Sequence, residues 1–347
     1  MNPSIDFRFN EMTTHKIRYG IAGYGLFAER AIAPAIQASP NSVLVAVQKR
    51  SLQAAREKAS ALSLRLAFDS AQSLAASAEV DAVFIASANC AHYDDVIAVA
   101  RAGKHILVEK PMAMNTSEAE RMVAECERNQ VKLMVGQAVR FSPLVNRMRA
   151  LVKSGTLGKI VSARADYSYD ARLSKRTWLF DRTVAGGGAV FDVGVHCLDT
   201  LRFVLSDEVE SVQSMLTPSP TPSATERSAI INLQFTRGTL GSIACSFEGP
   251  ARHSLLEVVG TEGLAYAYDF TVGGQSTMLS IGKRVGAALP EIESLSINIP
   301  DLYVEEVSAF SRCLLEDASS PIPGIDGVEN QKVLDLAMNG GGRISRV

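Results

Sequence analysis

Short apolar runs alternate with amphipathic stretches over the first third of the chain. Short apolar runs bounded by polar residues are typical of buried strands, and stretches rich in Ala, Arg, Glu and Lys are typical of helices. Strands are expected at residues 16–22, 43–47, 82–86, 106–108 and 132–135, and helices at residues 26–38, 52–61, 93–102 and 116–130. Apolar strands that alternate with helices predict a parallel sheet covered on both faces.

Residues suited to helix ends lie at two of these boundaries. Gly103 is placed to end the helix at 93–102, because glycine adopts the left-handed backbone found there. Ser117 and Glu120 are expected to act as cap partners where the helix at 116–130 begins.

After about residue 141 the pattern changes to strands in which inward and outward residues alternate. A helix is expected before them at 144–154, and another near the end of the sequence at 304–315. Two antiparallel hairpins are expected, one of residues 228–235 and 240–247 and one of residues 255–260 and 264–268. The Pro-rich segment 217–223 predicts a solvated connection between strands.

A parallel domain followed by an antiparallel one predicts an α/β domain plus an α+β domain. The first is expected at residues 1–141, of which 1–15 form an N-terminal extension, and the second at 142–347. A length of 347 residues suits two domains.

Composition and charge narrow the class of protein. The 35 basic and 37 acidic residues give a net charge of −2, which argues against a nucleic-acid partner. No apolar run approaches the roughly 20 residues that span a bilayer, and the first residues lack the apolar segment of a secretory signal. The five cysteines are scattered without a CxxC pair, as expected of reduced thiols. We therefore expect a cytoplasmic protein with neither a membrane nor a nucleic-acid partner.

The sequence GYGLFA at residues 23–28 lies between the first strand and the first helix. In that position the first glycine permits a tight turn, the second lets a pyrophosphate approach the backbone, and the helix N-terminus faces the anion. The pattern predicts a dinucleotide site, with contacts from Gly23, Tyr24, Gly25, Leu26 and Phe27.

The second strand should end in an acidic residue if the ribose 2′-hydroxyl of NAD is bound there. Instead the strand runs into Gln48, Lys49, Arg50 and Ser51. Two cations and a hydroxyl would attract the 2′-phosphate of NADP, which a carboxylate would repel. NADP is therefore the expected cofactor, with NAD as the alternative.

Two further motifs carry a family resemblance. AGKHILVEKP at residues 102–111 ends a parallel strand with Glu109, Lys110 and Pro111, and GGGAVFDVGVHCLD at 186–199 contains Asp192 and His196. With the Gly-rich turn at this distance, the chain resembles the Gfo/Idh/MocA family (glucose–fructose oxidoreductase, inositol dehydrogenase) of NAD(P)-dependent oxidoreductases. The resemblance implies a Rossmann domain followed by a domain with a large, open, mostly antiparallel sheet.

The resemblance also implies roles for these residues. Lys110 would contact the substrate hydroxyl and the nicotinamide ribose, Asp192 a neighbouring hydroxyl, and His196 would be the general acid/base. The segment with Ala88, Asn89 and His92 would lie beside the cofactor, as would Glu109, although Ser87-Ala88 stands where the family has Thr-Pro.

The chemistry of these residue types agrees with those roles. Oxidation of a secondary alcohol removes a hydride from carbon and a proton from oxygen, and histidine suits the proton step. An ammonium such as that of Lys110 stabilises a developing alkoxide. Asp192, His196 and Asp199 are spaced to share one face of a helix, and a metal site is the alternative use of that face. Since no further His or Cys cluster supports a metal, none is expected.

Polar and aromatic residues before the GGG motif are candidates for a sugar pocket, because aromatic faces suit carbohydrate C–H surfaces. They are Tyr169, Arg176 and Trp178, together with Tyr167. A packed strand and its loop explain these residues equally well. Arg140, Phe141 and Tyr303 are weaker candidates near the cleft.

The sequence thus predicts an NADP-preferring oxidoreductase that acts on a secondary alcohol or carbonyl of a sugar, polyol or related cyclic substrate. The resemblance leaves two alternatives: an NAD-dependent enzyme that cleaves glycosides, and a non-catalytic dinucleotide-binding regulator. Because an open sheet invites association, a homodimer or homotetramer through the C-terminal sheet is expected.

Overall fold

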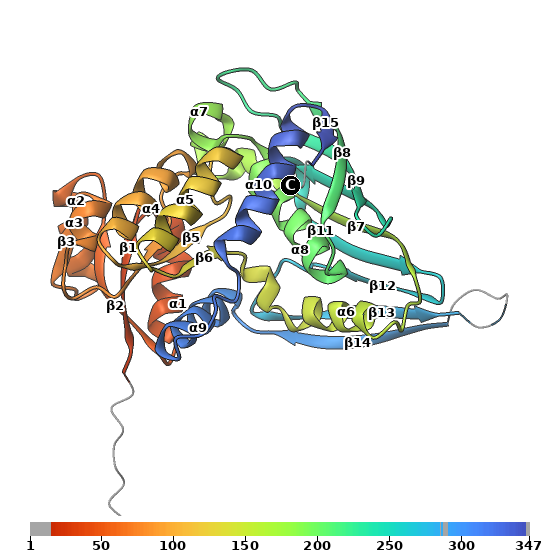
Figure 1. Ribbon diagram of the computed structural model, residues 1–347, viewed down its shortest axis with the longest axis horizontal. Helices are drawn as coiled ribbons and strands as arrows, with labels where there is room; N and C mark the ends of the chain where they lie inside the picture. The colour runs from red at the N-terminus through yellow and green to blue at the C-terminus, as the bar shows by residue number, and fades with distance from the viewer. Residues whose placement is uncertain (1–14, 285, 287–290, 345–347) are drawn as a thin grey trace, which may run out of the picture.

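The computed structural model describes residues 15–284, 286 and 291–344. Its first sheet is six-stranded and parallel, in the order β3-β2-β1-β4-β5-β6 (Figure 1). The strands are β1 Ile17–Ala22, β2 Ser42–Gln48, β3 Leu66–Phe68, β4 Ala82–Ile85, β5 His105–Glu109 and β6 Leu133–Gly136. This is the doubly wound Rossmann arrangement that the sequence predicts. The predicted N-terminal extension lies, apart from His15, outside the described residues.

The helices of this domain follow the predicted boundaries closely. They are α1 Ala33–Ala38, preceded by a π-helical turn at Ala28–Ile32, α2 Leu52–Ala61, α3 Ala71–Ala75, α4 His92–Arg101 and α5 Thr116–Arg128. The sequence did not predict β3 or α3, which are short. The predicted cap of α5 is wrong: Asn115 is the N-cap, and its side chain accepts a hydrogen bond from the backbone N–H of Glu118 at 3.0 Å.

The second sheet has nine strands in the order β14-β13-β12-β11-β7-β10-β9-β8-β15. Only β7 and β10 pair in parallel, and both predicted hairpins, β9–β10 and β11–β12, are confirmed. The strands are β7 Ile160–Asp170, β8 Val209–Thr217, β9 Ser228–Phe235, β10 Leu240–Ser246, β11 Glu248–Gly260, β12 Gly263–Tyr268, β13 Gln275–Lys283, β14 Glu291–Ile299 and β15 Gly341–Arg343. The Pro-rich segment connects β8 to β9, as predicted.

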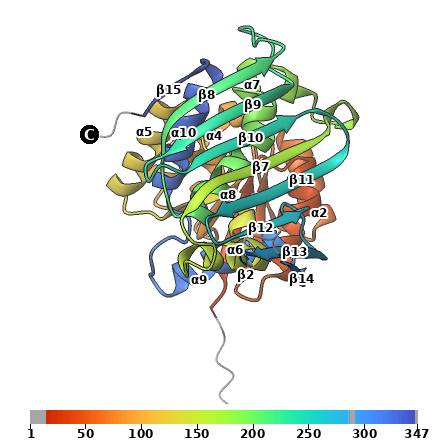
Figure 2. The same cartoon turned by 90° about the vertical axis from the view of Figure 1, so that its right-hand side faces the viewer.

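Helices cover one face of the nine-stranded sheet and leave the other bare (Figures 1 and 2). The helices after α5 are α6 Pro143–Lys153, α7 Arg182–Ala185, α8 Val195–Leu205, α9 Leu302–Leu315 and α10 Gly324–Met338. Of these, α9 returns to the parallel sheet, where Val307 and Phe310 complete its hydrophobic core. The chain therefore crosses between the two sheets more than once, and the space between them is lined from both sides.

The helices in the described part of the chain all lack the length and apolar character needed to cross a membrane. All five cysteines lie in that part and are free, as expected.

Candidate active site

The turn after β1 has the geometry that a dinucleotide requires. Gly23 has φ +77°, and a Cβ there would collide with the backbone of Ser87, so only glycine fits. At Gly25 a Cβ would meet only the carbonyl oxygen of Gly23, at 3.8 Å, which leaves open space beside the backbone. The helix begins directly after it, and the N–H of Glu29 already bonds to the Gly25 carbonyl at 2.9 Å. This cradle at a helix N-terminus fits a pyrophosphate.

The predicted loop contacts differ in exposure. Tyr24 is buried, Leu26 is exposed, and Phe27 packs edge-on against Tyr303 with ring centroids 5.5 Å apart.

Some of the polar residues at the end of β2 bond to the Gly-rich turn, and others in the described structure do not. Gln48 accepts a hydrogen bond from the N–H of Gly23 at 2.8 Å, and Lys49 donates from Nζ to the carbonyl of Tyr24 at 2.7 Å. Ser51 is the N-cap of α2, while Arg50 is exposed beside it. Lys49 therefore supports the Gly-rich turn, and the freely exposed cation is Arg50.

Asn89 and His92 hold neighbouring segments in place. Asn89 is buried and donates from Nδ2 to the carbonyl of Ala185 at 2.9 Å. The ring of His92 is fully buried, with Nδ1 3.0 Å from the carbonyl oxygen of Pro111 and Nε2 3.0 Å from that of Ser87. Because both of its ring nitrogens are occupied in this way, His92 joins these two loops. Its predicted place beside the cofactor stays a prediction. Ala88 is half-buried and follows Ser87 in the first of these loops.

Lys110 and Asp192, predicted from separate motifs, form an ion pair. Lys110 Nζ donates to the backbone carbonyl of Asp192 at 2.7 Å and to its Oδ1 at 3.2 Å. The other carboxylate oxygen accepts from the hydroxyl of Tyr169 at 2.6 Å, and Arg176 donates to both oxygens at 3.3 Å. Burial opposes ionisation of Asp192, but Lys110 and Arg176 outweigh it and hold its pKa well below the usual range.

The backbone around Asp192 is a π-helical turn, Val190–Gly194, that leads into α8. Turns of this kind occur often at functional sites. The turn is held by Glu226, whose Oε1 accepts from the N–H groups of Gly188 and Val190 at 2.8 and 3.0 Å. A Cβ on Gly188 would collide with the carbonyl oxygen of Glu226. The GGG motif thus lets the chain pass Glu226 closely.

His196 lies in the first turn of α8 and lines an open cavity. Its buried Nδ1 has no hydrogen-bond partner among the described residues, and its ring lies 6.1 Å from that of Tyr167. Burial, followed by the charge of Lys110, lowers the pKa of His196 well below its ordinary value. The imidazole is therefore neutral near pH 7 and can accept a proton.

Asp199 does not join Asp192 and His196. Its carboxylate accepts two hydrogen bonds of 2.7 Å from Arg140 and one of 2.8 Å from Asn330. Arg140 also pairs with Asp326 at 2.7 Å, so it is occupied in the core. Phe141 packs against the core of the parallel sheet. Within the described residues, no three His, Cys, Asp or Glu side chains are grouped to hold a metal ion.

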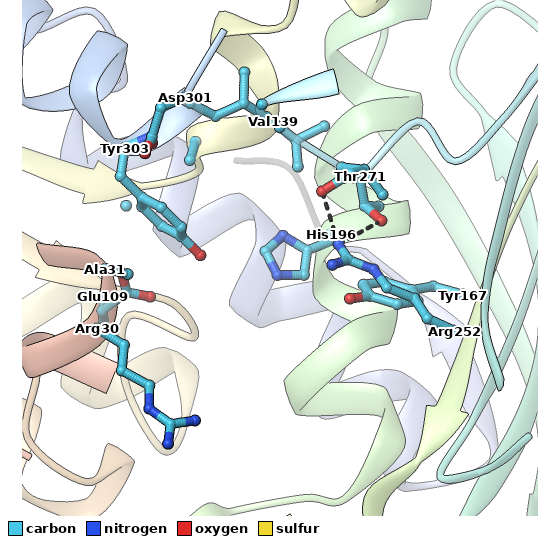
Figure 3. A pocket seen from close by; sticks show the side chains of 16 residues that line it. Arg30, Ala31, Glu109, Val139, Tyr167, His196, Arg252, Thr271, Asp301 and Tyr303 are labelled. Atoms are coloured by element: carbon cyan, nitrogen blue, oxygen red, sulfur yellow. Dashed lines mark hydrogen bonds between the residues drawn. The ribbon is translucent and has the colours of Figure 1, made fainter. Parts of the chain in front are cut away.

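A cavity of about 340 Å³ lies between the carboxyl edge of the parallel sheet and the inner face of the nine-stranded sheet (Figure 3). Its lining includes His196 and Glu109, which the sequence identified, and the weaker candidates Tyr167 and Tyr303. It also includes residues that the sequence did not point to, namely Arg30, Arg252, Thr271 and Asp301. Trp178 is not part of this lining and packs against the core of the large sheet.

Glu109 is a buried acid at the wall of the cavity. Its Oε2 accepts from the N–H of Lys110 at 3.2 Å, and Oε1 has no partner among the described residues. Burial raises the pKa of Glu109 to about 7, although Lys110 opposes the shift. Near neutral pH this group can therefore hold or release a proton.

Comparison with known proteins agrees with this geometry. Residues 17–137 match the model of an oxidoreductase family with an NAD-binding Rossmann fold, and residues 145–266 match that of the GFO/IDH/MocA C-terminal domain. The chain belongs to the Gfo/Idh/MocA family. The family resemblance and the fold class drawn from the sequence are confirmed, and the protein is an NAD(P)-dependent oxidoreductase.

Relatives in the Gfo/Idh/MocA family match most of the chain. It is 28% identical over 316 residues to 1,5-anhydro-D-fructose reductase of Ensifer adhaerens, which covers 90% of this chain and 92% of the relative. It is 31% identical over 252 residues to trans-1,2-dihydrobenzene-1,2-diol dehydrogenase of Mus musculus, covering 72% and 74%. The structure of levoglucosan dehydrogenase with NADH and L-sorbose has the same fold, with a TM-score of 0.85 at 21% identity over 96% of this chain and 100% of that one.

Proposed function

We propose that this protein transfers hydride between NADP and a secondary alcohol or carbonyl of a sugar, polyol or related cyclic compound. The observation that carries the proposal is a neutral, half-buried His196 lining the cavity beside the Lys110–Asp192 ion pair. Two relatives are named for activity on a sugar derivative and on a diol, and these names support the same substrate class.

A bound nicotinamide supplies or accepts the hydride. The residues of this chain then stabilise the charge on the substrate oxygen and transfer its proton. The Lys110 ammonium, fixed by Asp192, stabilises a developing alkoxide. His196 accepts the proton during oxidation and returns it during reduction. Tyr169 and Arg176 keep Asp192 ionised, and so keep Lys110 oriented.

The proton is assigned to His196 and not to Lys110 for an electrostatic reason. The ammonium of Lys110 donates to both the backbone carbonyl and the carboxylate of Asp192, which hold it in place. His196 is half-buried, and the withdrawal of its ring from water, followed by the charge of Lys110, favours its neutral form. Lys110 therefore supplies a fixed positive charge, and His196 accepts the proton.

NADP is the cofactor that the end of β2 favours. Arg50 is exposed next to the helix N-cap Ser51, and no acidic side chain follows β2 directly. A guanidinium beside a helix N-terminus suits a phosphate monoester better than a ribose hydroxyl. NAD remains the alternative.

We also propose that the bare face of the nine-stranded sheet pairs with a second copy, giving a homodimer or homotetramer. Met215 pairs in register with Ile230, and both are exposed, by 79% and 48%. Further along the sheet Tyr268, exposed by 53%, lies opposite Leu255. A row of apolar side chains across an uncovered sheet is typical of an association surface (Figure 2). The five free cysteines support a reducing compartment, the cytoplasm.

The test is incubation with NADP or NAD and a panel of sugars, polyols and keto-sugars while reduced nicotinamide is recorded. Reduction of NADP by at least one polyol or sugar, faster than that of NAD, is expected. Intact NADP binding without nicotinamide turnover on any member would instead favour the non-catalytic regulator. Cleavage of a glycoside without net reduction would favour the glycoside-cleaving alternative.

A further inference from the structure

Arg252 extends from β11 into the cavity that contains His196 (Figure 3). Its Nη2 donates to the backbone carbonyl of Thr271 at 2.9 Å and contacts the hydroxyl oxygen of the same residue at 3.2 Å. The guanidinium also lies over the ring of Tyr167, 5.5 Å from its centroid. These contacts fix the orientation of the side chain at low cost in conformational freedom.

Arg252 is an exposed residue on the cavity lining, and its charge is not paired with a carboxylate as the charges of its neighbours are. Lys110 and Arg176 both pair with Asp192. No carboxylate in the described residues forms an ion pair with Arg252, and the bonds to Thr271 occupy only one of its three nitrogens. Its positive field nevertheless reaches His196, where it helps to lower the pKa of the imidazole.

The acids around the cavity are occupied elsewhere. Asp192 is bonded to Lys110, Arg176 and Tyr169. Asp301 caps α9, accepting from the N–H groups of Tyr303 and Val304. Glu109 is partly protonated near neutral pH, because burial raises its pKa to about 7. None of these acids forms an ion pair with Arg252, so the cavity lining holds a cation without a carboxylate partner among the described residues.

We propose that Arg252 binds a carboxylate on the substrate, and that the sugar or polyol oxidised here is a sugar acid. This rests on the proposed function, since it concerns the same cavity. The remaining guanidinium donors match the two oxygens of a planar carboxylate. Arg252 and His196 both line the cavity of about 340 Å³, so one small substrate can contact both residues.

The test compares matched acidic and neutral substrates: D-glucuronate with D-glucose, and D-gluconate with D-sorbitol. For the wild-type enzyme, kcat/KM is expected to be higher for an acid than for its neutral partner. Arg252→Met should lower kcat/KM for the acid by about 10- to 150-fold, the range for a charge-assisted hydrogen bond, and lower that for the neutral partner far less. Arg252→Lys should retain part of the preference, because it keeps the charge.

Arg149→Met is the matched control. Arg149 also lies over an aromatic ring, that of Phe203 at 4.0 Å, but it is not part of the cavity lining. Arg149→Met should leave kcat/KM unchanged for both the acid and its neutral partner. Equal losses on acid and neutral substrates in Arg252→Met would overturn the inference, as would a preference for D-glucose 6-phosphate over every sugar acid.

A binding measurement separates this inference from the proposed function. D-Gluconate is titrated calorimetrically into the enzyme–NADP complex. Binding by the wild type and its loss in Arg252→Met support the carboxylate site even if no substrate of the panel is oxidised. Absence of binding overturns the site. Turnover of sugar acids that is unaffected by Arg252→Met overturns it too, while the proposed function stands.

Discussion

Lys110 donates from its ammonium to both the backbone carbonyl and the side-chain carboxylate of Asp192, at 2.7 and 3.2 Å. The two residues lie 82 positions apart, one after a strand of the parallel sheet and one in the π-helical turn before α8. The pair therefore joins the two halves of the molecule at the site. It also sets the position of the charge that would face the substrate oxygen.

Asp192→Asn removes the charge that orients Lys110. We expect kcat to fall by about 10²- to 10³-fold, the range for loss of one electrostatic contact, while NADP affinity is retained. Steady-state kinetics and a cofactor titration check both parts. Asp170→Asn is the control, because Asp170 forms a similar pair with Arg172 on the surface. An Asp192 variant no slower than that control would show that the pair does not act in catalysis.

His196→Asn removes the proposed proton acceptor. A positioned acid/base contributes about 10²- to 10⁴-fold, so kcat should fall in that range with NADP affinity unchanged. Because burial holds the pKa of His196 well below 6.5, oxidation by the wild type should show no loss attributable to this group between about pH 7 and pH 8. Turnover near the wild-type value would assign the proton to another residue.

Gly25→Ala places a methyl group in the open space beside the Gly-rich turn. The free energy of unfolding should change by less than about 0.5 kcal/mol, while the Kd for NADP rises about tenfold or more, because the methyl group occupies the place of the pyrophosphate. Gly23→Ala should behave differently. A side chain there meets the backbone of Ser87, so stability itself should fall by about 1–3 kcal/mol. Unchanged NADP binding by Gly25→Ala would contradict this placement.

Glu306→Gln should stabilise the protein at high pH. Glu306 is fully buried on α9, and neither carboxylate oxygen has a partner in the described structure. Burial, with the charge of Glu109, raises its pKa well above the usual value. The folded state then binds more protons than the unfolded state above about pH 4.5, so stability is lost as pH rises. The variant should raise Tm more at about pH 8 than at about pH 5. Equal Tm shifts at about pH 8 and about pH 5 would show that ionisation of Glu306 does not affect stability.

Arg50→Ala tests the choice of cofactor. Loss of a charge-assisted contact should weaken NADP by about 10- to 150-fold and leave NAD nearly unchanged. Lys49→Ala should weaken both cofactors similarly, because Lys49 bonds to the carbonyl of Tyr24 in the Gly-rich turn. The Kd values of both variants for NADP and for NAD test whether Arg50 contacts the 2′-phosphate. Equal losses in Arg50→Ala would count against contact with the 2′-phosphate.

Regular periodicity made the long elements of this fold predictable from sequence. Apolar strands and the two hairpins lie within a few residues of their predicted ranges, whereas β3 and α3 are too short to produce a periodic signal. The return of α9 was not predictable, because Val307 and Phe310 follow the second domain in sequence but pack into the core of the first.

The candidate site was predictable where motifs carry it and not where tertiary structure builds it. Lys110, Asp192 and His196 lie in two short motifs. Arg252 enters the cavity from a part of β11 whose pairing with β7 is irregular between Glu248 and His253, a feature without a sequence signal. Asp199 was placed with His196 by helical spacing, but its carboxylate is held by Arg140 in the core.

Hydride transfer is tested by following hydrogen from the substrate carbon to the nicotinamide. A sugar oxidised in the panel is prepared with deuterium on the carbinol carbon and incubated with NADP, and the reduced cofactor is analysed by mass spectrometry. We expect deuterium in the NADPH formed by the wild type and almost no labelled NADPH formed by His196→Asn in the same time. Conversion of the sugar with no deuterium in the cofactor would contradict hydride transfer.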